Sequence, residues 1–108
     1  MGNVKPARVT LMPQILIELD KEVEAEARTM FQNLSGDVSF IDAKRFDGAV
    51  VLQLLAMLNT VTIPLLAKIV IERIRANRHV VIKKKGLVIR GLSADNAVKV
   101  LSELAKND

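Results

Sequence analysis

The stretch from Gly48 to Arg75 reads GAVVLQLLAMLNTVTIPLLAKIVIERIR, and its interpretation decides the fold of the chain. Residues 49–71 within it span 23 positions and carry one charge, Lys68. A run of this length and apolarity is typical of a membrane span, of a buried core helix, or of a helix covered by oligomerisation. The interruptions inside the stretch and the elements around it distinguish these three alternatives.

Polar residues and a proline interrupt the stretch near its centre. Pro64 has no backbone donor and disfavours helical geometry in the residue before it, so one straight helix is not expected. We predict two helices or one kinked helix, broken around residues 59–64, with halves at 49–58 and 64–77 and Asp47 as the N-cap. In lipid, each central polar side chain would need an internal partner. A central core helix partly buried by self-association is therefore favoured, with membrane insertion as the alternative.

Periodicity predicts short elements on both sides of this stretch. Alternating apolar residues indicate a strand over residues 8–19, with Pro13 at an edge or a bulge. The other expected elements are a helix over 20–34 capped by Asp20, a strand over 38–41, a hairpin over 79–91 that turns at Lys84-Lys85-Gly86, and a final helix capped by Ser93. The predicted fold is a single α+β domain over residues 1–108. Its order is β-α-β-long kinked α-β-β-α, with the long apolar central helix packed on a small sheet.

The composition argues against several kinds of chemistry. There is no cysteine, which excludes disulfides, thiolate metal sites and cysteine nucleophiles. His79 is the only histidine and is interpreted as an ordinary strand-edge residue. The acidic residues from Glu18 to Glu26 diverge around a helix and indicate a solvated face. With neither a phosphate-binding glycine loop nor a GxSxG motif, we expect no enzymatic activity, no cofactor and no metal.

The N-terminal sequence MGNVKPARVTLMPQ bears on localisation. It lacks the uninterrupted apolar core and the small-residue cleavage site of a secretory signal. The expected localisation is therefore cytoplasmic, with membrane association as the alternative.

Basic residues gather in the middle of the chain. Residues 1–47 hold six basic and eight acidic side chains, residues 48–90 hold eight and one, and residues 91–108 hold two and three. A basic contact surface is predicted from seven of them: Arg73, Arg75, Arg78, Lys83, Lys84, Lys85 and Arg90. Its alternative roles are a solvated surface, a contact for an acidic protein partner or a membrane, and a contact for nucleic-acid phosphates. No aromatic side chains lie among these residues for base stacking, which makes nucleic acid the least favoured partner.

The apolar stretch is also the predicted site of self-association. It is apolar on nearly all faces, so a soluble helix with this sequence needs cover from more than one side. A chain of 108 residues has little other material to supply that cover. A homo-oligomer is therefore expected, with a core or oligomer interface made of Leu52, Leu55, Leu58, Leu65, Leu66 and Ile69.

The sequence IPLLAKIVIERIRANRHVVIKKKGLVIRGLSADNAVKVLSEL, residues 63–104, carries a family resemblance. An apolar helix ends in a basic stretch and is followed by a strand, a glycine turn, a second strand and a closing helix. Over residues 48–105 this order resembles the small effector-associated constant component domains of bacterial conflict systems. The resemblance implies a non-enzymatic adaptor in antiviral defence that recognises a partner or relays assembly to an effector.

Three functions follow as expectations. The favoured one is a bacterial protein-interaction module that self-associates through residues 49–71 and binds an effector or signalling protein. The alternatives are a small membrane-associated protein and a nonspecific, phosphate-contacting nucleic-acid binder.

Overall fold

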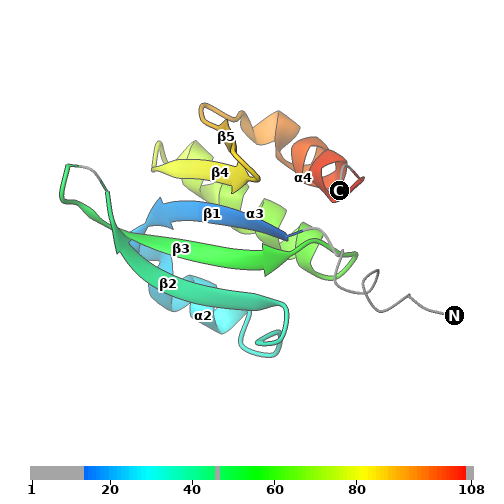
Figure 1. Cartoon of the computed structure of the whole chain (residues 1–108), viewed down its shortest axis with the longest axis horizontal. Coiled ribbons are helices and arrows are strands. Elements are labelled where there is room, and N and C mark those ends of the chain that lie inside the picture. The colour runs from blue at the N-terminus through cyan, green and yellow to red at the C-terminus, as the bar shows by residue number, and fades with distance from the viewer. Residues whose placement is uncertain (1–13, 46, 107–108) are drawn as a thin grey trace, which may run out of the picture.

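The computed structural model describes residues 14–45 and 47–106 (Figure 1). Along the chain, the elements are β1 (Gln14–Asp20), a 3₁₀ turn (Lys21–Val23), α2 (Glu24–Met30), β2 (Val38–Lys44), β3 (Val50–Met57), α3 (Thr62–Arg75), β4 (Val80–Lys84), β5 (Leu87–Ile89), a second 3₁₀ turn (Ala94–Asn96) and α4 (Ala97–Lys106). The first part of the strand predicted over residues 8–19, including Pro13, lies outside the described residues. The α+β class is confirmed.

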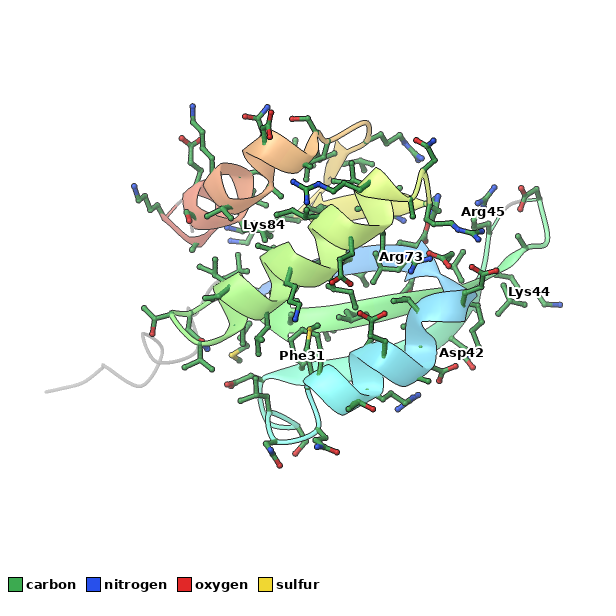
Figure 2. All side chains as sticks on the ribbon, turned by 180° about the vertical axis from the view of Figure 1, so that it is seen from behind. Phe31, Asp42, Lys44, Arg45, Arg73 and Lys84 are labelled. Atoms are coloured by element: carbon green, nitrogen blue, oxygen red, sulfur yellow. The ribbon has the colours of Figure 1, made fainter. Side chains whose placement is uncertain are left out.

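The strands form one five-stranded sheet in the order β2-β3-β1-β4-β5, with every neighbouring pair antiparallel. Because β1 and β2 both run antiparallel to β3, they are parallel to each other with β3 inserted between them. Helices α2, α3 and α4 lie behind the sheet in Figure 1 and in front of it in Figure 2. The order β1-α2-β2-β3-α3-β4 is the split βαβ or ferredoxin-like arrangement, extended here by β5 and α4. This arrangement supports many unrelated functions, so the fold alone assigns none.

The helix predicted over residues 49–58 is wrong, because this segment is strand β3. It lies between β1 and β2 and turns Leu52, Leu54 and Ala56, all 0% exposed, towards the helices. On the other face, Val51 is also buried. Seven of the eight residues in Val50–Met57 are apolar. The periodicity of such a short apolar run does not distinguish a strand from a buried helix. There is accordingly no long central helix, and the apolar stretch forms the central strand, a turn and α3.

The predicted interruption around residues 59–64 is where the strand ends and α3 begins. The side-chain oxygen of Asn59 accepts hydrogen bonds from the backbone N–H groups of Val61 and Thr62, at 2.8 and 2.9 Å. The buried Thr62 hydroxyl donates to the carbonyl of Met57 at 2.5 Å. Pro64 sits in the first turn of the helix, where its missing donor costs no intrahelical bond. Helix α3 has 14 residues, and no helix in the described ranges has the length and apolarity to cross a bilayer.

The core between sheet and helices is aliphatic, apart from Phe31. It combines the helix-facing residues of β1 and β3 with one face each of α2, α3 and α4 (Figure 2): Ile15, Ile17, Leu19, Leu52, Leu54, Val23, Ala27, Leu66, Ile69, Val70, Ala97 and Leu101. These buried side chains supply the main apolar contribution to stability. The chain thus provides its own cover for the apolar stretch.

The other predicted helices and strands are present with changed boundaries. Helix α2 ends at Met30, four residues before its predicted end. The β4–β5 hairpin turns through Lys85 and Gly86, whose φ angles of 48° and 86° are the left-handed pair of a type I′ turn. Ser93 occupies the N-cap position of the last helical segment, which begins as the 3₁₀ turn before α4, but its side chain makes no capping hydrogen bond.

Candidate binding site

Within residues 14–45 and 47–106, no helix packs against one of the two faces of the sheet. Because strand side chains alternate, the residues of β1 and β3 that point away from the core line this open face. Two rows cross it. The first row contains Ile41, Gln53, Glu18 and Val81, and the second contains Ser39, Leu55, Leu16, Lys83 and Val88. The open face therefore places a row that is polar at its centre beside a row that is apolar at its centre.

A hollow of about 620 Å³ lies on this face, and we call it the basic hollow. Its lining residues come from the middle of the sheet, the β2–β3 hairpin and the residues next to β4 and β5: Glu18, Lys44, Arg45, Asp47, Gln53, His79, Lys83 and Arg90. All of these side chains are polar or charged. The volume falls within the range of about 300–1,000 Å³ typical of ligand sites.

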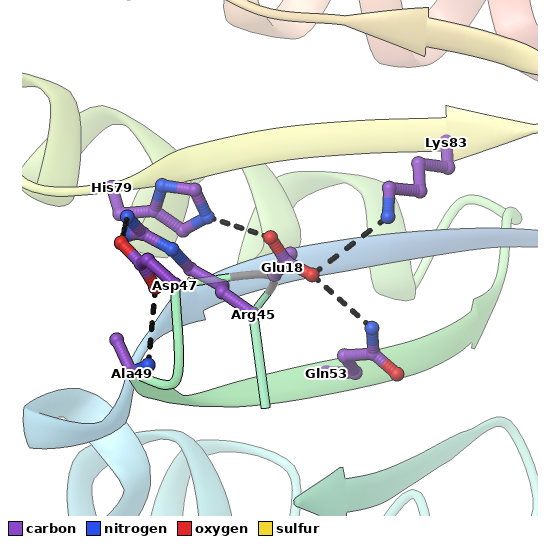
Figure 3. Close-up of polar contacts among 7 residues, drawn as sticks. All are labelled: Glu18, Arg45, Asp47, Ala49, Gln53, His79 and Lys83. Carbon is purple, nitrogen blue, oxygen red and sulfur yellow. Dashed lines mark hydrogen bonds and ion pairs between the residues drawn. The ribbon is translucent and has the colours of Figure 1, made fainter. Parts of the chain in front are cut away.

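Glu18 in β1 organises the floor of the basic hollow (Figure 3). Only 8% exposed, its carboxylate lies 2.7 Å from Nε2 of His79, 3.2 Å from the amide nitrogen of Gln53 and 3.7 Å from Nζ of Lys83. Burial alone would raise the pKa of Glu18, but hydrogen bonds from His79 and Gln53 and the charge of Lys83 together lower it. Glu18 is therefore ionised at neutral pH, and three side chains from three segments are held around it.

The β2–β3 hairpin brings a second carboxylate and two cations to the rim. Asp47 accepts a hydrogen bond from the backbone N–H of Ala49 at 3.1 Å and another from the Arg45 guanidinium at 2.6 Å. These two contacts, with the backbone bond the larger, lower the pKa of Asp47. Gly48 takes a φ of 89°, which a residue with a side chain rarely adopts. The tight turn thus places Arg45 over the basic hollow beside Lys44.

The charges of the basic hollow do not balance. Four cations (Lys44, Arg45, Lys83 and Arg90) face two carboxylates, which leaves a net charge of +2 when His79 is neutral. Both carboxylates are already engaged by side chains of the site. Within the described part of the chain, Lys44 and Arg90 form no ion pair. The arrangement can therefore attract and hold an anionic group.

The predicted basic contact surface is divided among several places. Arg73 donates two hydrogen bonds to the carboxylate of Asp20, at 3.1 and 3.0 Å, so Asp20 serves this ion pair rather than the predicted helix cap. Arg78 pairs with Glu22 at 3.1 Å. Lys84 is buried on the helix-facing side of β4 and belongs to no exposed surface. The exposed Arg75 and Lys85 do not line the hollow, and only Lys83 and Arg90 do so.

The six residues predicted for a core or an oligomer interface lie in different parts of the structure. Four of them, Leu52, Leu58, Leu66 and Ile69, are at most 3% exposed inside the chain's own core. Leu65 of α3 is half-buried against that core, and half-buried Leu55 lies on the open face. Of the predicted set, Leu55 is thus the residue placed beside the basic hollow.

The sequence did not indicate that the other residues of the hollow lie together, because they are far apart from one another along the chain. Glu18 and His79 are 61 positions apart, and His79 was interpreted as a strand-edge residue. One local signal existed: in Ile15-Leu16-Ile17-Glu18-Leu19, alternation places Glu18 on the face opposite the most apolar residues. A charged residue at that position indicates an open sheet face. Nothing local linked it to Lys44 or Arg90.

Comparisons of the chain with protein-family models, with curated proteins and with solved structures found no match. In residues 14–45 and 47–106, no group of three or more histidine, cysteine or acidic side chains is arranged to hold a metal ion. The lining of the basic hollow offers cationic and amide donors. Its chemistry is that of anion binding.

Proposed function

We propose that the protein is a non-enzymatic interaction module that docks an acidic segment of a partner protein on the open face of its sheet. The observation that carries this proposal is the basic hollow, with its excess of cations, next to half-buried Leu16 and Leu55 on a face without helical cover. A segment that alternates acidic and apolar residues matches both rows. Its apolar side chains would meet Leu16 and Leu55, and its carboxylates would meet the hollow.

Apolar and charged groups have different roles in protein interfaces. Apolar contact in the centre supplies most of the binding free energy, while charged groups at the rim raise the association rate and exclude wrong partners. The net charge of the basic hollow favours acidic over basic segments. Among the described residues, Phe31 and Phe40 pack on the helix side of the sheet and offer no base-stacking surface on the open face. Binding of nucleic acid through its phosphates alone is therefore the alternative that the measurement with duplex DNA distinguishes.

The biological setting rests on the resemblance of residues 48–105 to effector-associated constant component domains. In that setting the module acts in the bacterial cytoplasm, in a conflict or antiviral system, and its partner is an effector or a signalling protein. The order helix, strand, glycine turn, strand and helix after Pro64 agrees with the resemblance.

Arg90→Glu tests the proposed docking. The probe is a fluorescent peptide of alternating Glu and Leu, with a Lys and Leu peptide and duplex DNA for comparison, all measured by fluorescence anisotropy at low salt. We expect the acidic peptide alone to bind, and Arg90→Glu to weaken it about tenfold, which corresponds to about 1.4 kcal/mol. Lys99→Glu is the matched control, because Lys99 is exposed on α4 behind the sheet. Equal binding by both variants, or preference for DNA, would contradict the proposal.

A second candidate is self-association through the same face. The observation that favours it is the apolar centre of the second row, together with Ile41, which is 46% exposed in the neighbouring row. Two copies would bury these side chains against each other, but they would also bring two basic hollows together. Apolar burial favours the dimer and repulsion between the two positively charged hollows opposes it. Salt screens the repulsion and therefore favours the dimer.

A further inference from the structure

We infer that the basic hollow receives a phosphate monoester on a side chain of the partner, so that phosphorylation of the partner controls docking. This inference rests on the proposed function and names the chemical group that the hollow selects. It is argued from the charge, the donors and the organisation of the site.

The charge balance favours a dianion over a single carboxylate. The four cations and two carboxylates of the hollow leave a net charge of +2. A carboxylate would neutralise half of this, whereas a phosphate monoester carries about −1.5 to −2 at pH 7. The carboxylates of Glu18 and Asp47 are each held in place by at least two hydrogen bonds. They are therefore not expected to move towards the other cations of the hollow. The site is thus complementary in charge to one phosphate group.

The donors also suit phosphate. Arg45 and Arg90 each present a planar guanidinium, which matches the spacing of phosphate oxygens and binds them through paired hydrogen bonds. The hydrogen bond to Asp47 uses one terminal nitrogen of Arg45, so further N–H groups of the same guanidinium remain for a ligand. Lys83 adds an ammonium donor from β4, and Lys44 lines the hollow at the end of β2. The hollow therefore combines forked and point-charge donors around one space.

Glu18 prepares the floor of the site before any ligand arrives. It is nine-tenths buried in the middle of β1, and its contacts fix the ring of His79 and the amide of Gln53 (Figure 3). Since its carboxylate is ionised and only accepts hydrogen bonds, Nε2 of His79 carries the proton and Nδ1 is the ring atom left for other contacts. Glu18 is a positioning residue in this arrangement. A preformed floor reduces the entropy lost when a ligand binds.

Three peptides of one acidic, apolar sequence test the inference, with Ser, Glu or phosphoserine at a single position. Binding is measured by isothermal titration calorimetry at constant pH and salt. We expect the phosphoserine peptide to bind about tenfold more tightly than the Glu peptide, because its second charge meets the unbalanced cations. Arg45→Gln and Arg90→Gln should each reduce this preference, whereas Lys99→Gln should leave it unchanged. Thermal unfolding of each variant verifies that it remains folded.

The outcomes separate the two proposals. Equal affinity for the phosphoserine and Glu peptides would overturn this inference and leave the proposed function standing. Absence of binding by all three peptides would overturn both. Free O-phosphoserine and inorganic phosphate serve as competitors. If either bound as tightly as the phosphopeptide, the site would take a small phosphorylated molecule, and the part of the inference that places the group on a partner would be wrong.

Discussion

Glu26 of α2 and Glu72 of α3 bring two carboxyl groups together across the helix layer. The hydrogen bond between them, with some desolvation and the charge of Glu72, raises the pKa of Glu26 above its ordinary value of 4.5. A group with a raised pKa binds its proton more tightly in the folded than in the unfolded state. Its contribution to stability is therefore present below pH 4.5 and is lost as the pH rises through the folded-state pKa.

Glu26→Gln should consequently stabilise the protein at neutral pH. Because Glu26 is exposed and screened by solvent, the expected gain is only about 0.2–0.5 kcal/mol, as for like-charge pairs on a helix surface. The difference in melting temperature between variant and wild type should grow between pH 4 and pH 7. Glu103→Gln, at an exposed position of α4, is the control. A difference that stayed constant with pH would show that the pair does not share a proton.

At the residue scale, the sequence identified single charged side chains but not their contacts. Glu18 was visible as a charge in an apolar strand, and the basic residues near His79 were visible as a cluster. Of the seven basic residues predicted for one surface, the structure places Lys83 and Arg90 in the basic hollow. The reason is geometric: strand alternation sends Lys83 and Lys84 to opposite faces of the sheet.

At the element scale, Lys84 ties β4 to α4. Its Nζ donates to the carbonyl of Leu104 at 2.6 Å, near the C-terminal end of the helix (Figure 2). Terminal carbonyls of a helix have no intrahelical partner, and a cation there also interacts favourably with the helix dipole. Leu101 and Leu104 add apolar contacts on the same side. Helix α4 is therefore held by one buried cation together with a short apolar face.

Lys84→Met should loosen α4 while leaving the sheet intact. The substitution keeps an unbranched apolar stem but removes a charged hydrogen bond worth about 1.5–3 kcal/mol, so we expect a loss of about 1–2 kcal/mol. Urea unfolding gives the free energy, and hydrogen exchange locates the change. Exchange should accelerate in α4 and stay slow in β3. Lys99→Met, on the exposed side of α4, should change neither the free energy of unfolding nor the exchange rates. If α4 exchanged as slowly in Lys84→Met as in the wild type, the hydrogen bond from Lys84 would not be what holds the helix.

The assignment of β3 shows why an element can be misread from sequence. Gln53 is the only polar residue in Val50–Met57, and both β1 and β2 pair with this strand. Its short-range pattern is the same for a buried helix and for a central strand. Only the presence of two neighbouring strands determines which forms, since these satisfy its backbone hydrogen bonds.

At the scale of the whole molecule, the open face leads to a prediction about mass. If two copies associate through Leu16 and Leu55, their basic hollows repel each other at low salt, and salt screens this repulsion. Light scattering should then show a mass near the 11.9 kDa of one chain at low salt and a rise towards twice that value as salt increases.

Leu55→Glu should keep the protein at the mass of one chain under all conditions, because it places a charge in the apolar row. Val98→Glu is the control, since Val98 is already 52% exposed on α4. Circular dichroism establishes that both variants are folded. A wild-type mass that never changes with salt would exclude self-association through this face.

The sequence by itself determined the α+β class, the aliphatic core, the interruption before Pro64, the glycine turn of the hairpin and the closing helix. Each of these depends on residues close together in the chain, where periodicity, capping and backbone preference act. The tertiary structure alone decided that residues 50–57 form a strand, that the sheet has one open face, and that Glu18, Arg45, His79 and Arg90 meet in one hollow. These features depend on which strands pair, and that choice is made by contacts between segments far apart in sequence.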